Sequence, residues 1–342
     1  MNPFAGILLI ALGSIGAASY YVQFKIVKTW AWESYWLSQG VAAWLIAPIL
    51  FAYIFVPKGE LLPIINEAPS SAKLMAMFFG ALWGFGGLTF GLSIRYLGIA
   101  LGQSIALGLC AAFGTLIPPV IAGESLFSTT AGILTIVGVS ITVAGIAIIG
   151  YAGSLKSKEM TEEEKNAAVK EFALKKGIFI AIFAGVMSAC FNFGFESARP
   201  IENVALAHGT NPLFQKNPSL IFIMLGGFVT NLVYCGYLNI KNKTYKDYIS
   251  VSGSVLLNNL FFTFLAGFLW FLQFHFFGMG SSKLPEGMAV FGWSILMALN
   301  IAISNIWGIF LNEWKGAKRK TIIVLLTGIF ILILSTFVVK LG

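Results

Sequence analysis

The sequence predicts an all-α membrane protein whose ten transmembrane helices form a 5+5 inverted repeat. Only 11% of its 342 residues are charged and 58% are hydrophobic, whereas soluble domains carry about 25% charged residues. The charges gather in short joints between apolar runs of about 20 residues, the length that crosses a bilayer core as a helix. Two homologous halves of five helices must insert in opposite orientations, a common plan among transporters.

The apolar runs follow one another along the chain. Several contain Gly or Pro, which membrane helices tolerate when neighbouring helices satisfy the freed backbone groups. We expect the helices at residues 4–24, 34–56, 72–94, 98–121, 129–152, 177–197, 219–240, 253–277, 288–312 and 321–341. The third run contains "GALWGFGG" and the eighth contains "AGFLWFLQ", a weak echo that supports a repeat.

The one long polar joint lies between the fifth and sixth runs and reads "GSLKSKEMTEEEKNAAVKEFALKK". Its acidic residues precede most of its basic residues, an order that suits a short surface helix with i,i+4 pairs. We therefore divide the chain into a first five-helix repeat at 1–152, a cytoplasmic linker at 153–176 and a second five-helix repeat at 177–342.

The basic residues predict the orientation in the membrane. Sixteen of the 22 Lys and Arg residues lie in alternate joints, and the positive-inside rule makes those joints cytoplasmic. Both termini then lie on the opposite, outer side. The net charge of +8 is therefore explained by basic residues on one side of a lipid bilayer. We do not expect a nucleic acid as a partner.

Motifs that would indicate an enzyme do not occur. The chain contains no G-x-x-x-x-G-K-[ST], HExxH, CxxC or G-x-S-x-G pattern. Its three cysteines all fall inside apolar runs, which argues against a disulfide framework. The glycines at 80, 84, 87 and 91 are spaced to form one smooth stripe for helix packing. We expect neither catalysis, nor a metal site, nor a cofactor.

Polar side chains within the apolar runs mark the candidate substrate site, because such groups are costly in lipid and usually face the interior or a wet cavity. Amides offer donors and acceptors to hydroxyl groups, and a tryptophan ring can cover the apolar side of a sugar. The alternative is that these groups only bond one helix to another. The candidates are Gln273, Trp270, Asn259 and Thr263 on one face of the eighth run, together with Asn192, Gln103, Trp83, Asn300 and Trp293.

Three titratable residues are candidates for proton coupling, and each has a plainer interpretation. Glu33 lies in the first turn of a helix, where a carboxylate stabilises the helix dipole. Glu196 is placed to pair with Arg199 three residues later. His275 lies about 200° around the helix from Gln273, in a phenylalanine stripe that suits lipid or a neighbouring helix.

Several segments carry a resemblance to a known family. The segments "FKIVKTWAWESYW", "FGALWGFGGLTFGLSIRYLG", "LWFLQF" and "NEWKGAKRK" resemble the L-rhamnose–proton symporters of the bacterial drug/metabolite transporter superfamily, over nearly the whole chain. The resemblance implies a drug/metabolite transporter-like fold in the bacterial inner membrane, with periplasmic termini. It also implies import of L-rhamnose, and of the related L-lyxose, with H⁺ as the coupling ion.

The resemblance also ranks the candidate residues. Glu33 within "WESYW" and Gln273 within "WFLQF" fit the family's pattern, whereas Glu196 and His275 depart from it. Two other functions stay open. An exporter of amino acids or other metabolites would need charged anchors such as Glu196 and Arg199. A membrane enzyme or scaffold would show no substrate-driven uptake, and an enzyme would need a nucleophile or metal set that the sequence lacks.

Overall fold

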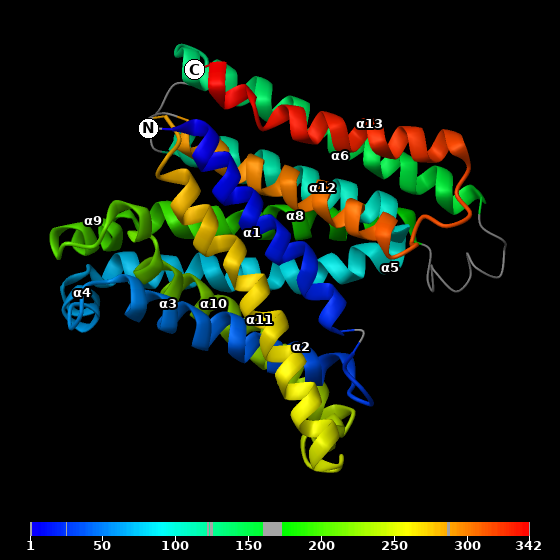
Figure 1. Ribbon diagram of the computed structural model, residues 1–342, viewed down its shortest axis with the longest axis horizontal. Coiled ribbons are helices and arrows are strands. Elements are labelled where there is room, and N and C mark those ends of the chain that lie inside the picture. Colours follow the sequence, from blue (N-terminus) through cyan, green and yellow to red (C-terminus); the bar gives the residue numbers. More distant parts are fainter. Residues whose placement is uncertain are drawn as a thin grey trace. The chain divides into compact units, whose positions relative to one another are not determined.

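The protein is helical throughout the part of the chain that the computed structural model describes, residues 2–24, 26–121, 123, 126–159, 173–285 and 288–341. The longer elements are α1 (Pro3–Phe24), α2 (Trp32–Gly40), α3 (Ala47–Phe55), α4 (Leu61–Glu67), α5 (Ser70–Ile121), α6 (Thr130–Glu159), α8 (Leu174–Ser197), α9 (Arg199–Ala207), α10 (Asn217–Lys241), α11 (Gly253–Ser281), α12 (Gly292–Phe310) and α13 (Arg319–Ser335) (Figure 1). Nine segments within these ranges are long and apolar enough to cross a membrane. The prediction of an all-α membrane protein is confirmed.

The second predicted helix, 34–56, is interrupted. α2 and α3 are joined by a π-helical turn, Val41–Ile46, in which the Ala47 N–H donates to the Ala42 carbonyl five residues back. Pro48 explains the change, because it has no N–H for the carbonyl four residues before it. π-helical turns occur frequently at functional sites.

The third and fourth predicted helices are one helical segment, α5, that turns sharply between the two apolar runs. A Cβ on Gly102 would lie 2.7 Å from the carbonyl oxygen of Ser93, although nine residues of straight helix would separate them by about 13 Å. The two runs are therefore separate spans. α6 continues past the predicted boundary at 152 to Glu159, and linker residues 160–172 lie outside the described part of the chain.

The chain divides by its internal contacts into two compact units, and each unit contains segments from both halves of the sequence. The first unit comprises Met1–Ala11, Phe85–Asn192 and Gly280–Gly342, and the second comprises Leu12–Gly84 and Phe193–Met279. The helices α1, α5, α8 and α11 therefore each contribute one part to each unit.

In the first unit, α13 packs along α6 (Figure 1). Glycines allow this approach, since a Cβ on Gly145 would lie 2.7 Å from a side-chain atom of Leu332. A small polar cluster is buried in the same region. Thr142 is bonded to Ser335 at 2.9 Å and receives a hydrogen bond from Ser294 at 3.1 Å.

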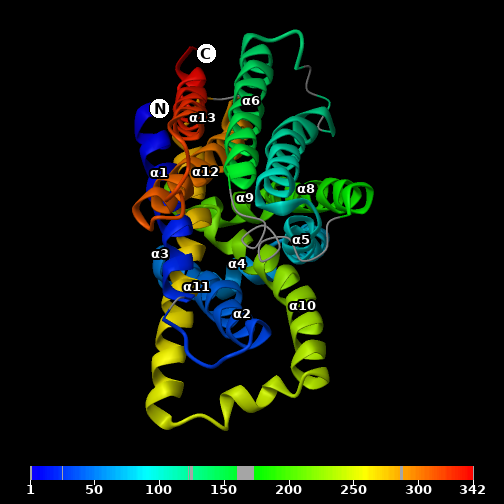
Figure 2. The same cartoon turned by 90° about the vertical axis from the view of Figure 1, so that its right-hand side faces the viewer.

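In the second unit, α10 packs against α2, the π-helical turn and α3. Only part of the glycine stripe expected on α5 packs against a neighbouring helix. Gly80 and Gly84 pack against α10, whereas no described atom lies within 4 Å of a Cβ built on Gly87 or Gly91. α10 and α11 extend to the same end of this unit, where a short segment around Thr244–Tyr248 joins them (Figure 2).

Large apolar side chains cover much of the outer surface of both units. Phe179 and Phe330 are exposed in the first unit, and Phe78, Val233 and Tyr237 are exposed in the second. A surface this apolar is typical of contact with lipid. Because this surface is apolar, the buried polar groups described below are the candidates for binding a substrate.

Candidate functional site

Three indole rings meet in the second unit, and we call Trp44, Trp83 and Trp270 the tryptophan cluster. The rings of Trp83 and Trp270 are stacked, with centroids 5.7 Å apart and an interplanar angle of 26°. Trp44 meets both edge-on, at 6.1 Å from Trp83 and 5.9 Å from Trp270. The structure thus brings two of the predicted substrate-binding residues into contact and adds a third aromatic residue that the sequence analysis did not select.

Glycines fix where these rings lie. The Trp44 ring covers Gly40, where an added Cβ would lie 2.5 Å from the ring. The Trp83 ring covers Gly227 of α10 in the same way. A side chain at either position would displace the indole, so the cluster depends on glycine at both.

The segment "WESYWLSQGVAAW" contained the signal that identifies Trp44. Trp32, Trp36, Gly40 and Trp44 recur every fourth residue, which places them along one side of a helix. Trp36 stacks on Trp32 at 5.7 Å and meets Trp44 at 5.8 Å. Its indole N–H donates to Asn231 of α10 at 3.0 Å.

The residues of the predicted polar face of α11 make different contacts. Gln273 is buried, donates from Nε2 to the Trp270 carbonyl at 3.0 Å, and so lies within one turn of the tryptophan cluster. Thr263 is bonded to Ser38 of α2 at 2.8 Å. Asn259 uses both ends of its amide on the backbone of Lys28, at 3.0 and 2.7 Å. Thr263 therefore bonds α11 to α2, and Asn259 bonds α11 to the joint that precedes α2.

Glu33 is buried at the start of α2 and accepts two side-chain hydrogen bonds. Asn242 and Thr244, which follow α10, each donate to its Oε1 at 2.9 Å. The same joint is tied to α2 by the Tyr248 hydroxyl, which donates to the Ser34 carbonyl at 2.8 Å. Burial raises the pKa of Tyr248 to about 12, so this donor keeps its proton.

His275 is also buried, and it faces a neighbouring helix. Its Nδ1 lies 2.9 Å from Oδ1 of Asn217, the first residue of α10. An amide oxygen only accepts, so Nδ1 carries the proton in this contact. Phe51, Phe55 and Phe214 surround the imidazole at centroid distances of 4.7, 4.9 and 5.9 Å.

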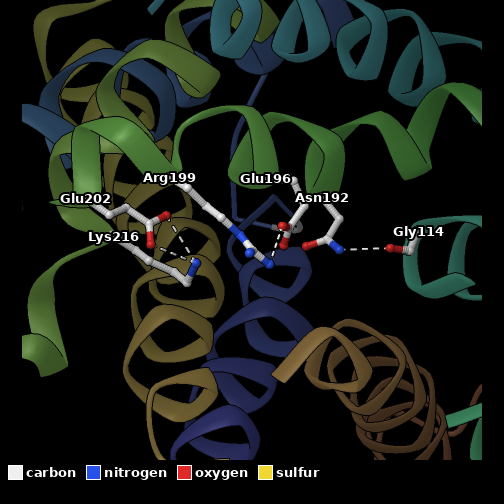
Figure 3. A network of polar contacts seen from close by, with 6 residues as sticks. All are labelled: Gly114, Asn192, Glu196, Arg199, Glu202 and Lys216. Atoms are coloured by element: carbon white, nitrogen blue, oxygen red, sulfur yellow. Dashed lines mark hydrogen bonds and ion pairs between the residues drawn. The ribbon is translucent and has the colours of Figure 1, made fainter. Parts of the chain in front are cut away.

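Glu196 belongs to a cluster of four charges near the junction of α8 and α9 (Figure 3). Its carboxylate pairs with Arg199 at 2.6 Å. Next to this pair, Lys216 binds both oxygens of Glu202 at 3.1 and 3.2 Å, and its ammonium lies 4.9 Å from the centre of the Phe195 ring. The cluster holds two positive and two negative groups when all are ionised.

The other predicted residues lie in the first unit. Asn192 is buried on α8 and donates to the Gly114 carbonyl at 2.8 Å (Figure 3). Trp293 of α12 stacks on Phe191 at 5.7 Å and donates to the Cys110 carbonyl at 3.2 Å. Asn300 is half-buried on α12. The side chain of Gln103 lies outside the described part of the structure.

A histidine between two carboxylates joins α4 to the end of α9 in the second unit. His208 Nδ1 lies 2.7 Å from Glu60, and its Nε2 lies 2.8 Å from Glu67. The hydrogen bonds to Glu60 and then Glu67 raise the pKa of His208 above its usual value. Since carboxylates accept, two such contacts favour an imidazolium that donates from both nitrogens.

Comparisons with known proteins agree over nearly the whole chain. The family model of L-rhamnose-proton symport proteins (RhaT) matches residues 2–342. A protein of Yersinia pestis (strain Pestoides F), named L-rhamnose-proton symporter, is 36% identical over 341 residues, covering 98% of this chain and 97% of the relative. A protein of the same name from Yersinia pseudotuberculosis (strain YPIII) is similar to the same extent, 36% over 341 residues.

Proposed function

Because this chain belongs to the family of L-rhamnose-proton symport proteins, we propose that it imports L-rhamnose together with a proton across the bacterial inner membrane. It is a multi-pass transporter and not an enzyme, and H⁺ is its coupling ion. The comparisons support neither L-lyxose as a substrate nor the export of amino acids or other metabolites.

The fold that we propose is a ten-helix 5+5 inverted repeat of the drug/metabolite transporter type, with both termini in the periplasm. Its support is the pairing of helices at equivalent positions in the two halves. α6 and α13, the fifth and tenth spans in this scheme, pack together, as do α10 and the segments α2 and α3, the seventh and second spans. Helices related by a two-fold pseudo-axis can meet in such pairs.

The tryptophan cluster is the observation that carries the sugar-binding proposal. A neutral sugar has hydroxyl groups for hydrogen bonding and an apolar side of C–H groups, to which L-rhamnose adds a methyl group. Trp83, Trp270 and Trp44 supply broad apolar faces, and the Gln273 amide lies within one turn of them. Ligand sites of this kind combine aromatic walls with a few placed polar groups. Asn192, Asn300, Trp293 and Gln103, which belong to the first unit, stay proposed substrate-binding residues on the sequence argument.

Glu33 is the proposed proton-coupling residue, with Glu196 and His275 as further candidates. The ionised carboxylate accepts hydrogen bonds from Asn242 and Thr244. A protonated carboxyl has less accepting capacity and becomes a donor, so protonation would weaken the bonds between α2 and the joint after α10. This gives one proton a direct effect on how two helices are held together, which symport requires.

Purified protein in proteoliposomes tests both proposals. L-Rhamnose added outside, without an imposed gradient, is expected to make the external medium alkaline as sugar and protons enter together. Glu33→Gln should abolish the pH change while leaving sugar binding measurable. Uptake of L-rhamnose with no proton movement would contradict the coupling, and an unchanged pH dependence in Glu33→Gln would remove Glu33 from this role.

A further inference from the structure

Trp44 of the tryptophan cluster and the nearby Gln39 have buried polar atoms without a hydrogen-bond partner among the described residues. Gln39, the penultimate residue of α2, is 0% exposed, and neither its Oε1 nor its Nε2 has a partner. Trp44 is 2% exposed, and its indole N–H has no partner either. Neither residue was selected from the sequence.

Such groups are rare because their desolvation is not compensated. Burying an amide without a hydrogen bond destabilises a protein, and most buried polar side chains therefore have partners. An apolar residue of similar size would avoid this cost. A glutamine at this position indicates that a polar partner binds its amide during the transport cycle.

The position of Gln39 indicates what that partner is. Gln39 directly precedes Gly40, the residue that the Trp44 ring covers. The backbone carbonyl oxygen of Gln39 would lie 2.6 Å from a Cβ on Gly267, and Gly267 is one turn before Trp270 on α11. Gln39 thus lies where α2 contacts α11, next to the π-helical turn and to residues of the tryptophan cluster.

A third unpaired group lies on α1, which also packs against α11. Ser14 of α1 is fully buried, and its hydroxyl has no partner in the described part of the chain. Its neighbour Gly13 packs on the backbone of Gln273, where an added Cβ would lie 2.9 Å from the Gln273 Cα. Unpaired polar groups therefore occur on two helices, α1 and α2, that both pack against α11.

We infer that the Gln39 amide and the Trp44 indole N–H bind hydroxyl groups of the transported sugar, while the rings of Trp83 and Trp270 cover its apolar side. This inference rests on the proposed function and makes it more specific. An amide that both donates and accepts can bind two neighbouring hydroxyls. Gln39 is therefore the residue that distinguishes the sugar from its deoxy analogues.

The experiment measures binding of L-rhamnose to purified protein in lipid nanodiscs. Gln39→Leu replaces the amide by an apolar group of similar size. We expect its affinity for L-rhamnose to fall about tenfold, the effect of losing one or two neutral hydrogen bonds, and its melting temperature without sugar to stay equal or rise. Wild-type affinity in this variant would overturn the inference.

Deoxy sugars make the test specific to individual hydroxyls. Among 2-, 3- and 4-deoxy-L-rhamnose, the wild type should bind at least one about tenfold more weakly than L-rhamnose, and Gln39→Leu should bind that analogue and L-rhamnose equally. Such non-additivity identifies a direct contact. Equal penalties in both proteins would overturn the inference. If Gln39→Leu does not fold, Gln39→Met serves in the same comparisons.

Thr210→Val is the matched control. Thr210 follows α9 and also has a buried hydroxyl without a described partner, so its replacement removes the same kind of group elsewhere in the second unit. Its affinity for L-rhamnose should match the wild type, and a tenfold loss here would overturn the assignment to Gln39. A wild-type protein that does not bind L-rhamnose would instead contradict the proposed function, which separates the two failures.

Discussion

At the scale of single residues, glycine decides where the aromatic rings of the candidate sugar site lie. Gly40 and Gly227 leave room for the rings of Trp44 and Trp83 to rest on helix backbones. The rings then meet at about right angles or stacked, at centroid distances of 5.7 to 6.1 Å. Aromatic pairs prefer such arrangements, so the geometry of the tryptophan cluster depends on Gly40 and Gly227 as well as on the rings.

Gly40→Ala tests this dependence. The added methyl group would lie 2.5 Å from the Trp44 ring, and the ring must move. We expect a loss of about 1–3 kcal/mol in stability and weaker binding of L-rhamnose, measured by thermal unfolding and by titration. The control is Gly236→Ala on α10, where no described atom lies within 4 Å of the new Cβ; this variant should keep wild-type affinity. Wild-type binding in Gly40→Ala would contradict the account.

Gln273→Ala tests the polar contribution of α11. Because Gln273 lies within one turn of Trp270, loss of its amide should weaken L-rhamnose binding about tenfold, while the protein still folds and elutes as the wild type does. Asn259→Ala provides the contrast. Its amide holds the backbone of Lys28, so this change should lower the melting temperature more than the affinity. A loss of stability in Gln273→Ala together with a loss of affinity in Asn259→Ala would contradict these assignments.

At the scale of elements, three polar contacts join segments that lie far apart in the sequence. Glu33 and Ser34 at the start of α2 are bonded to the joint after α10, and Asn259 of α11 is bonded to Lys28. At the α4–α9 contact, His208 is bonded to Glu60 and Glu67 beside a small apolar core that contains Ile64 and Ala205. Each contact holds the end of a helix, where a small change in bonding can alter helix position.

The contact of His208 predicts a pH dependence. The pKa of His208 is raised in the folded protein by Glu60 and Glu67, so its stabilising effect is complete below the unfolded pKa of about 6.5 and is lost as pH rises through the higher folded pKa. Hydrogen exchange of the α4 amides should therefore become faster above about pH 6.5 than intrinsic exchange alone explains.

His208→Gln is the variant for this measurement. It should remove the additional pH dependence of α4 protection, and Glu67→Gln should reduce it in part, because the Glu60 contact remains. A substitution of His275 is the control, because His275 contacts Asn217 and a group of phenylalanines and no carboxylate of this contact. It should leave the pH dependence of α4 exchange unchanged. Identical pH profiles of α4 exchange in the wild type and His208→Gln would contradict this role for His208.

At the scale of the whole molecule, hydropathy was sufficient to predict an all-α membrane protein, because each span must be apolar over about 20 residues whatever its neighbours are. The π-helical turn before Pro48 and the turn of α5 near Gly102 were missed, since backbone bonding and helix packing leave little trace in an apolar run. The chain also forms two contact units that combine segments of both halves.

The candidate site was predictable only in part for a similar reason. The residue types of Trp83, Trp270 and Gln273 suggested a sugar site, and the structure places them close to one another. Gln39 could not be identified in this way, because what distinguishes it is the lack of a partner in three dimensions. The partner of Asn259 lies 231 residues away in the sequence, and periodicity along one helix does not reveal such a contact.

The central claim is that L-rhamnose binds at the tryptophan cluster of the second unit. A structure of the protein determined by cryo-electron microscopy with L-rhamnose bound tests it most directly. The account predicts density for the sugar against the rings of Trp83 and Trp270, with hydroxyl groups within hydrogen-bond distance of the Gln39 amide and the Trp44 indole N–H. Sugar density that touches none of these residues would contradict it.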